Sequence, residues 1–348
     1  MKKTKLAAIF GLLCFVALQI VIYVVRKPAY TIKTNGKLYI VNKRSSNILV
    51  FDLSEGKEVS EIPIEVEPHE PINLSNQNRI VVTNYGTPDV MGKTITVIDA
   101  KTNKVEKTID LKGSLQPHGI VAFPQSSKVA VVTDKGNNLL VVNTETGIVE
   151  KNIPTQQIVS HLVVLDPKKP LAYVTNIHSN SVSVINLDLD KVIKIIPCGL
   201  ATEGIDITPD GSEIWVTNNK ENTISVINTA TYQITNTLTS GKESLRLKFS
   251  IDGKHCLVTN ASDGTISVYD QHTKKQIKTI RLHGKTNLIE KILYHTPRPV
   301  GILIHPNGLY AFIANSNANR IEVIDMKTFT VVSTIATGKI PDGLALID

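Results

Sequence analysis

Several features that often disclose a protein's function are scarce or missing in this chain of 348 residues. It contains three cysteines, one tryptophan and only 5% aromatic residues. Cys198 and Cys256 fall in different predicted elements, so their positions imply no disulfide. The chain has no serine nucleophile elbow, no Gly-rich phosphate loop and no HExxH motif. No standard catalytic signature can therefore be read from the sequence.

The positive charge of the chain is concentrated at its N-terminus. The formal net charge is +7, but residues 1–27 hold five Lys or Arg and no acid, which leaves 33 basic and 31 acidic residues elsewhere. A stacking platform for single-stranded nucleic acid needs a basic stripe with interleaved aromatic residues, and none is present. Nucleic acid is therefore not expected as a partner.

An uncharged run of twenty residues, Leu6–Val25, follows three N-terminal lysines. Its length matches a helix that spans a bilayer and exceeds the apolar region of a cleaved signal, and no Ala-x-Ala site follows it. More basic residues precede the run than follow it, which favours an N-terminus inside and the rest of the chain in the periplasm or on the cell surface. We expect a membrane anchor over residues 1–27. A cleaved signal and lipidation at Cys14 are the alternatives.

One short phrase recurs through the rest of the chain. Its clearest copies are Tyr-Val-Thr-Asn at 173–176 and Trp-Val-Thr-Asn at 215–218, which lie 42 residues apart. The polar residues that end the seven copies are Asn42, Asn84, Asp134, Asn176, Asn218, Asn260 and Asn315. Self-similarity at such a period is the sign of a repeat architecture.

Each copy contains four short runs in which apolar residues alternate with polar ones, as in β-strands. In the fifth copy these runs cover residues 204–208, 213–218, 223–228 and 232–238, here called strands a to d. Pro209-Asp210-Gly211 supplies the turn between a and b, because Pro presets φ and Gly permits a positive φ. Four-stranded units at this spacing are typical of propeller blades.

At this point the sequence resembles the YVTN-repeat β-propeller family, whose relatives include seven-bladed quinoprotein-like and nitrite-reductase-haem-domain-like propellers. Looser copies of the phrase are Leu-Val-Thr-Asn at 257–260 and Val-Val-Thr-Asn at 81–84. The resemblance implies an all-β, seven-bladed propeller of four-stranded antiparallel blades over residues 37–348. It implies little about function, because propellers host many unrelated activities.

The first copy lacks an a strand, and the missing strand is found at the other end of the chain. Residues 341–347 match residues 202–207 of the fifth copy. We therefore predict that the C-terminus inserts as the innermost strand of blade 1 and closes the ring, which removes exposed sheet edges. Residues 28–36 then form a linker between the anchor and the propeller.

Two insertions break the period, and both lie mainly on the face that carries the b–c and d–a connections. One lengthens the b–c loop of blade 2 over residues 85–93. The other adds thirteen residues before blade 7, around residues 283–299, and residues 287–294 could form a short helix over the channel. Both are open to the alternative of drift in tolerant loops.

Each a strand begins at this same face, next to the central channel. The residue expected at the mouth of the channel is the middle one of a Pro-x-Gly phrase, and from blade 1 to blade 7 the expected residues are Asp342, Glu70, His118, His161, Glu203, Leu245 and Val300. Five blades thus supply a polar arc of three carboxylates and two histidines. Arg246 and Arg298 are close in sequence to the two apolar members, and His69 precedes Glu70.

Four interpretations of this arc remain open. It is a polar channel end without a task, or it binds a ligand or a protein with the loops as a rim. Alternatively, His118 and His161 with Glu70 or Glu203 hold a metal or metallocofactor. Resemblance to lactonases and lyases implies an enzyme in which one of these histidines is the base and Arg246 or Arg298 anchors an anion. We take the binding module as the leading hypothesis, with no catalytic residue assigned.

Overall fold

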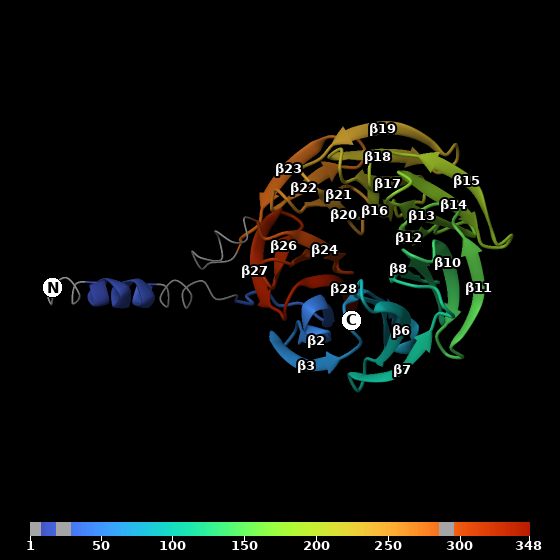
Figure 1. Ribbon diagram of the computed structural model, residues 1–348. Coiled ribbons are helices and arrows are strands. Elements are labelled where there is room, and N and C mark those ends of the chain that lie inside the picture. The colour runs from blue at the N-terminus through green and yellow to red at the C-terminus, as the bar shows by residue number, and fades with distance from the viewer. Residues whose placement is uncertain (1–7, 19–28, 285–295) are drawn as a thin grey trace.

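A computed structural model describes residues 8–18, 29–284 and 296–348 of the chain. Seven four-stranded antiparallel sheets surround a central axis, as the view along that axis in Figure 1 shows. The all-β seven-bladed propeller that the sequence predicts is confirmed. In each blade the a strand is innermost and the d strand outermost.

The strands of the blades have the following bounds. Blade 1 contains β28 (Pro341–Ile347), β1 (Lys37–Asn42), β2 (Asn47–Asp52) and β3 (Lys57–Pro63). Blade 2 contains β4 (Pro68–Leu74), β5 (Arg79–Gly86), β6 (Met91–Asp99) and β7 (Lys104–Asp110). Blade 3 contains β8 (Pro117–Ala122), β9 (Lys128–Thr133), β10 (Asn138–Asn143) and β11 (Ile148–Pro154). Blade 4 contains β12 (Ser160–Leu165), β13 (Leu171–Asn176), β14 (Ser181–Asn186) and β15 (Lys191–Pro197).

Blade 5 contains β16 (Thr202–Ile207), β17 (Glu213–Asn218), β18 (Thr223–Asn228) and β19 (Gln233–Thr239). Blade 6 contains β20 (Ser244–Phe249), β21 (His255–Asn260), β22 (Thr265–Asp270) and β23 (Gln276–Arg281). Blade 7 contains β24 (Pro299–Ile304), β25 (Tyr310–Asn315), β26 (Arg320–Asp325) and β27 (Thr330–Ala336). Two 3₁₀ turns cover Lys43–Ser45 and Ser75–Gln77.

The strand bounds expected for the fifth copy are right for b and c and shifted for a and d. Strand a begins two residues earlier, because Thr202 pairs with Asn218 at the end of b. Strand d begins one residue later, because Tyr232 adopts left-handed backbone with a φ of 58° and belongs to the turn.

The core consists of seven apolar clusters, one between each pair of neighbouring blades. Alternate side chains of one strand pack into two different clusters: Leu38 and Ile40 face blade 7, and Tyr39 and Val41 face blade 2. All four side chains are fully buried. The period-two pattern of the sequence therefore reflects packing of both faces of every blade.

The ring is closed as the sequence predicts. Strand β28 pairs antiparallel with β1, with Lys37 opposite Ile347 and Asn42 opposite Pro341. The C-terminal residues thus form the innermost strand of blade 1, and this closure is confirmed. Figure 1 shows the red β28 on the inner side of the blue blade in which β2 and β3 are labelled, although these strands come from opposite ends of the chain.

Residues 29–36, expected as a linker, lie against the propeller. The backbones of Ala29 and Thr334 are joined by a 3.0 Å hydrogen bond, so the segment starts along the outer edge of blade 7. Tyr30 then packs edge-on against Phe51 and donates to the Leu53 carbonyl at 2.6 Å. The segment therefore ties blade 7 to blade 1 in addition to β28.

The N-terminal anchor is not confirmed. Residues 8–18 form a helix, and the other parts of the expected Leu6–Val25 span lie outside the described residues. In the part of the chain that the structure covers, no helix is both long enough and apolar enough to cross a bilayer.

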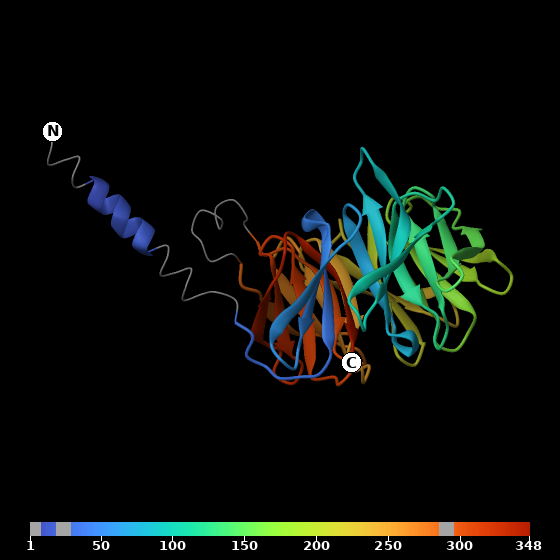
Figure 2. The same ribbon diagram turned by 90° about the horizontal axis from the view of Figure 1, so that it is seen from below.

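The two insertions have different outcomes. In blade 2 the extra residues lengthen the hairpin of β5 and β6, with Gly86 opposite Met91, and this hairpin rises above its face in Figure 2. The helix expected over residues 287–294 lies outside the described residues.

Candidate functional site at the channel mouth

A repeated turn carries each a strand into the mouth. The residue before every a strand has left-handed backbone, with φ between 47° and 58°, and the seven residues are Glu67, Gln116, Val159, Ala201, Glu243, Arg298 and Ile340. None is glycine, although L side chains rarely adopt this conformation. In six blades the carbonyl accepts the backbone N–H that follows the repeated phrase, as in Asn219 to Ala201 at 3.0 Å, and in blade 3 the Gln116 carbonyl accepts the N–H of Asp134.

The threonine of the repeated phrase holds the backbone of the mouth residues. Thr175 Oγ1 accepts the N–H of Leu162 in its own blade at 3.2 Å and donates to the Glu203 carbonyl of the next blade at 2.7 Å. Thr83 and Thr217 bridge neighbouring blades in the same way. The phrase therefore sets the positions of two consecutive mouth residues at once.

The register expected for blade 2 is wrong by one residue. Pro68 pairs with Asn84 just as Ser160 pairs with Asn176, so the mouth residue of blade 2 is His69. Glu70 takes the place that Gly holds in the Pro-x-Gly phrase. The signal was present, because Pro68-His69-Glu70 aligns with Pro117-His118-Gly119.

The corrected mouth contains histidines from three consecutive blades, whose rings are in contact: His69 and His118 meet edge to face, and His118 and His161 are tilted by 32°. The ring of His118 lies between those of His69 and His161, at centroid distances of 4.6 and 3.8 Å. His69 Nδ1 and His118 Nε2 are 2.9 Å apart. Burial lowers the pKa of both His69 and His118 well below 6.5, and the nearby charges of Lys43, His161 and Arg246 act in the same direction. These two imidazoles are therefore neutral at pH 7.

The third histidine has a different environment. His161 Nδ1 lies 3.1 and 3.2 Å from the two carboxylate oxygens of Asp134, and Asp134 also accepts the Tyr85 hydroxyl at 3.0 Å. His161 Nε2 faces Glu203 Oε1 at 3.8 Å, which is too far for a hydrogen bond. By contrast, His69 Nε2 and His118 Nδ1 are sealed from solvent and have no partner. Among the three rings, His161 presents the nitrogen that a ligand can reach.

The terminal residue expected for the phrase in blade 3 is wrong by one, because Pro117 pairs with Thr133 just as Ser160 pairs with Asn176, and Asp134 is the next residue. In blades 4, 5 and 6 the Asn that ends the phrase donates to a serine hydroxyl of strand c, in the pairs Asn176–Ser183, Asn218–Ser225 and Asn260–Ser267 at 2.9 to 3.0 Å. In blade 3 the equivalent residue is Thr133, which donates to Asn138 Oδ1. Asp134, one residue further on, accepts from Tyr85 and His161 at the mouth.

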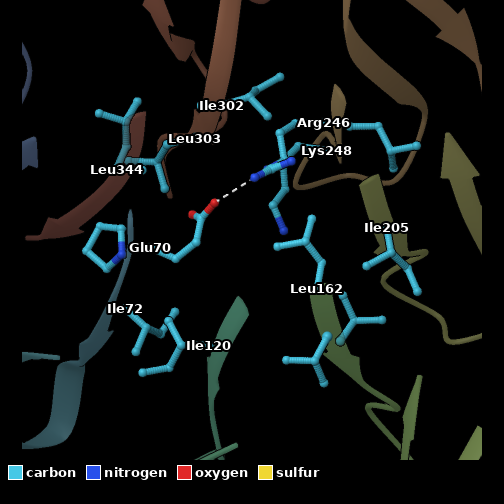
Figure 3. A pocket seen from close by; sticks show the side chains of 16 residues that line it. Glu70, Ile72, Ile120, Leu162, Ile205, Arg246, Lys248, Ile302, Leu303 and Leu344 are labelled. Atoms are coloured by element: carbon cyan, nitrogen blue, oxygen red, sulfur yellow. Dashed lines mark hydrogen bonds and ion pairs between the residues drawn. The ribbon is translucent and has the colours of Figure 1, made fainter. Parts of the chain in front are cut away.

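A single arginine crosses the central channel below the histidines. Arg246 Nη2 lies 3.1 Å from Glu70 Oε1 and Nη1 lies 3.2 Å from Glu203 Oε1. The dashed line in Figure 3 marks the contact with Glu70, which comes from blade 2, whereas Arg246 comes from blade 6. The residue is buried, with 9% of its surface exposed. Glu70 and Arg246 both occupy positions where blades 1, 3, 5 and 7 have glycine.

Glycine is required at some of these positions by close approach of the next blade. A Cβ on Gly204 would collide with the Leu245 carbonyl, and one on Gly343 would collide with the His69 carbonyl. Blades 2, 4 and 6 depart from this rule and direct Glu70, Leu162 and Arg246 into the channel, as Figure 3 shows.

The remaining predicted residues lie at the rim of the mouth. Asp342 is buried and contacts His69 Nδ1 at 3.4 Å and Lys43 Nζ at 3.5 Å. Arg298 makes two bonds to Glu243, at 2.7 and 2.9 Å, and its side chain is 40% exposed. Of the seven candidate residues, His118, His161, Glu203 and Asp342 belong to the ring of a-strand mouth residues. Arg246 and Arg298 also line the mouth, and Glu70 lies below it in contact with Arg246.

Arg246 lines two cavities. The upper one, about 360 Å³, is the mouth, whose polar lining includes His161, Glu203 and Asn219 and whose apolar lining includes Leu245 and Val300. The lower one, about 190 Å³, is lined largely by Ile, Leu and Val side chains, as Figure 3 shows. The polar lining expected along the channel is thus concentrated at its mouth.

The metal hypothesis gains no support from this geometry. Within the described ranges 8–18, 29–284 and 296–348, no group of three His, Cys, Asp or Glu side chains is arranged to hold a metal ion.

Comparison with known proteins identifies the family. The profile described as the cytochrome D1 heme domain matches residues 72–291, which is more than half of the chain. The chain belongs to the cytochrome D1 heme domain family. No curated protein sequence matches it at a significant level.

Solved structures share the fold of this family member. A functionally unknown protein from Desulfotomaculum acetoxidans DSM 771 aligns with a TM-score of 0.73 and 17% identity, covering 90% of this chain and 99% of the other. Hydrazine synthase from Kuenenia stuttgartiensis aligns with a TM-score of 0.68 and 18% identity, covering 80% and 89%. Identities this low show the propeller fold alone.

The family's description implies a haem, and the mouth can be tested for it. A haem iron commonly takes an axial histidine. Here the three imidazoles contact one another at centroid distances of 4.6 and 3.8 Å, which leaves no slot between them, and the free nitrogens of His69 and His118 are sealed from solvent. Arg246 closes the floor of a mouth of about 360 Å³, near the lower limit for ligand sites. As arranged, the described residues of this family member do not fit the group.

Proposed function

We propose that this member of the cytochrome D1 heme domain family is a binding module that takes a small molecule at the mouth of its propeller. The observation that carries the proposal is the convergence of buried polar side chains from several blades on one cavity of about 360 Å³. Concave sites with a few convergent polar groups are the usual location of ligand binding.

The energetics of the mouth favour a ligand site over a purely structural role. Arg246, Glu203 and Asp342 are each less than one-sixth exposed and are held by charged partners. Such buried ion pairs add little net stability compared with apolar packing. Every neighbouring interface of the propeller is closed by an apolar cluster instead. The charges at the mouth therefore serve recognition.

The test is a binding survey with the full-length protein and a matched variant. Thermal shift and calorimetry would be run against small amines, carboxylates, sugars, lactones, divalent metal ions and haemin. We expect at least one class to bind wild type and to lose affinity in the Glu203→Gln variant. Absence of binding by every class, or binding that survives this substitution unchanged, would refute the proposal.

A second candidate function, a hydrolase or lyase of the lactonase kind, is favoured by the Asp134–His161 pair. A carboxylate that holds Nδ1–H leaves Nε2 free to act as a general base. On a lactone, Nε2 would take a proton from water as its oxygen attacks the carbonyl carbon. The bond to the ring oxygen would then break, and that oxygen would receive the proton. Turnover of a lactone panel by wild type, lost in His161→Gln, would support this function, and complete inactivity would exclude it.

The location of the propeller is also a proposal. We infer that the Leu6–Val25 segment tethers it to a membrane and that the propeller lies outside the cytoplasm, in the periplasm or at the cell surface. The support is the length of the uncharged run and the lysines before it. Carbonate extraction of membranes and protease accessibility in intact cells test this. Release by carbonate, or protection that persists after the outer permeability barrier is opened, would contradict it.

A further inference from the structure

The balance of charge at the mouth is negative. Among the residues that the structure describes, three cationic side chains lie there, Lys43, Arg246 and Arg298, and each contacts a carboxylate. The carboxylates of the cluster are Glu70, Asp134, Glu203, Glu243 and Asp342. Five anions against three cations leave a formal charge of −2, since His69 and His118 are neutral. A site with this balance attracts cations and repels anions.

Two hydrogen-bond acceptors in the mouth point at each other without a donor between them. The Asp134 carboxylate has no hydrogen to donate, so Nδ1 of His161 donates in their contact, and in the tautomer with its one proton on Nδ1 the Nε2 atom is an acceptor. Glu203 Oε1, the second acceptor, is 3.8 Å away. A nitrogen at a hydrogen-bond distance of about 2.8 Å from both atoms fits between them.

Glu203 is held in place for this task by other contacts. Asn219 Nδ2 donates to Oε2 at 2.7 Å, and Arg246 Nη1 donates to Oε1 at 3.2 Å. Neither contact involves His161. A donor that satisfies both acceptors needs two hydrogens on one atom and gains from positive charge, and an ammonium group has both properties.

The cavity also offers an apolar surface. Leu245, Val300 and Ile340 line the mouth together with the polar groups and come from the blades that lack a polar mouth residue or from the turn before β28. Leu245 is 5% exposed, and it occupies the same ring position as His161 and Glu203 two blades and one blade earlier. A short hydrocarbon chain can pack there while its charged end faces His161 and Glu203.

We propose that the mouth binds a small aliphatic amine, whose ammonium group donates to Glu203 Oε1 and His161 Nε2 and whose hydrocarbon part packs against Leu245, Val300 and Ile340. This inference rests on the proposed function, because it names the ligand class of the same site.

The test is calorimetric titration of the full-length protein with three ligands of equal chain length, n-butylamine, butan-1-ol and butyrate. We expect the amine to bind at least about tenfold more tightly than the other two, because a charged hydrogen bond in a partly buried site contributes about 1.5–3 kcal/mol. Methylamine should bind more weakly than n-butylamine, because it lacks the apolar contact.

Three variants locate the contact. Glu203→Gln and His161→Gln should each weaken amine binding about tenfold or more. Glu106→Gln removes the same charge away from the mouth lining, where Glu106 contacts Arg79, and should leave affinity within about threefold because surface ion pairs contribute little. Circular dichroism melts check that each variant folds, and if Glu203→Gln does not, His161→Gln carries the test.

The outcomes separate the two proposals. Mouth-dependent binding of butyrate or butanol in preference to the amine would overturn the ammonium inference and leave the binding module standing. Amine binding that is unaffected by both Gln variants would also overturn the inference. If none of the survey ligands binds in a way that depends on Glu203, both proposals fail.

Discussion

Arg246 of blade 6 and Glu70 of blade 2 are joined by a 3.1 Å ion pair across the central channel, three blades apart around the ring. The same guanidinium contacts Glu203 at 3.2 Å, so one side chain holds two carboxylates from distant parts of the chain. The contact separates the polar mouth from the apolar channel below it. The stability of the mouth should therefore depend on Arg246.

Removing the arginine should leave two partly buried carboxylates without a cation. We expect Arg246→Met to lower the free energy of unfolding by about 3–5 kcal/mol, measured by urea denaturation at pH 7. The triple variant with Glu70→Gln and Glu203→Gln should recover most of this loss. Lys248→Met is the matched control, because its 3.1 Å pair with Asp206 is 41% exposed on the lysine side, and its loss should stay below about 1 kcal/mol. A triple variant as unstable as Arg246→Met would contradict this account.

The neutral histidines predict that stability falls with acid. The pKa of His69 and His118 is well below 6.5 in the folded protein, so below pH 6.5 the unfolded chain binds protons that the folded chain does not. The free energy of unfolding should then fall by about 1.4 kcal/mol per pH unit for each histidine between pH 6.5 and 5.

Replacement of His118 by Asn should reduce that slope, whereas replacement of the exposed His272 should not. Urea midpoints at several pH values measure this. Identical slopes for wild type and His118→Asn would show that the ring titrates normally in the folded protein.

Closure of the ring by β28 predicts a severe effect of truncation. Deletion of residues 341–348 removes the innermost strand of blade 1 and Asp342 from the mouth, and exposes the edge of β1. We expect loss of the cooperative thermal transition and rapid proteolysis. A truncated protein that melts like wild type would show that blade 1 does not depend on the C-terminus.

Loss of the threonine hydroxyl of the repeated phrase should weaken ligand binding in addition to lowering stability. Thr175→Val removes the bonds to Leu162 and to the Glu203 carbonyl, at a cost of about 1–3 kcal/mol, and should weaken binding at the mouth. Thr144→Val is the control, since buried Thr144 donates to the Ser127 carbonyl at 2.7 Å, away from the mouth lining. Both variants should lose similar stability, measured by urea denaturation. Equal ligand affinity in the two would refute the positioning role.

The sequence predicts the blades well because the contacts behind the repeated phrase are local and the same in each copy. Alternate side chains of β1 pack into two apolar clusters, which gives the period-two pattern. The match of residues 341–347 to residues 202–207 identifies the strand that closes the ring. The left-handed residue before each a strand could not be predicted, because no single residue type is common to Val159, Ile340 and their five counterparts. The turn is imposed by a hydrogen bond to the phrase rather than by local preference.

The site was predicted only in outline. The residues of the site were predicted from the register of the repeats. That register failed in blade 2, because Pro71 allows a second alignment of the Pro-x-Gly phrase in which His69 is not the mouth residue. The register also failed in blade 3, where Thr133 and not Asp134 holds the place of the terminal Asn. The role of Asp134 has no sequence signal, because its partners Tyr85 and His161 come from other blades. The reach of Arg246 to Glu70 depends on the width of the channel, which no short stretch of sequence encodes.

The central claim is that the mouth is one preorganised site in which His161 alone presents a free nitrogen to ligand. Histidine-selective ¹⁵N NMR of the full-length protein, titrated with n-butylamine at pH 7, tests it most directly. We predict that His161 is protonated on Nδ1, that its Nε2 resonance moves on titration, and that the resonances of His69 and His118 stay in place as neutral rings. An unchanged His161 signal, or equal shifts of all three, would contradict the account.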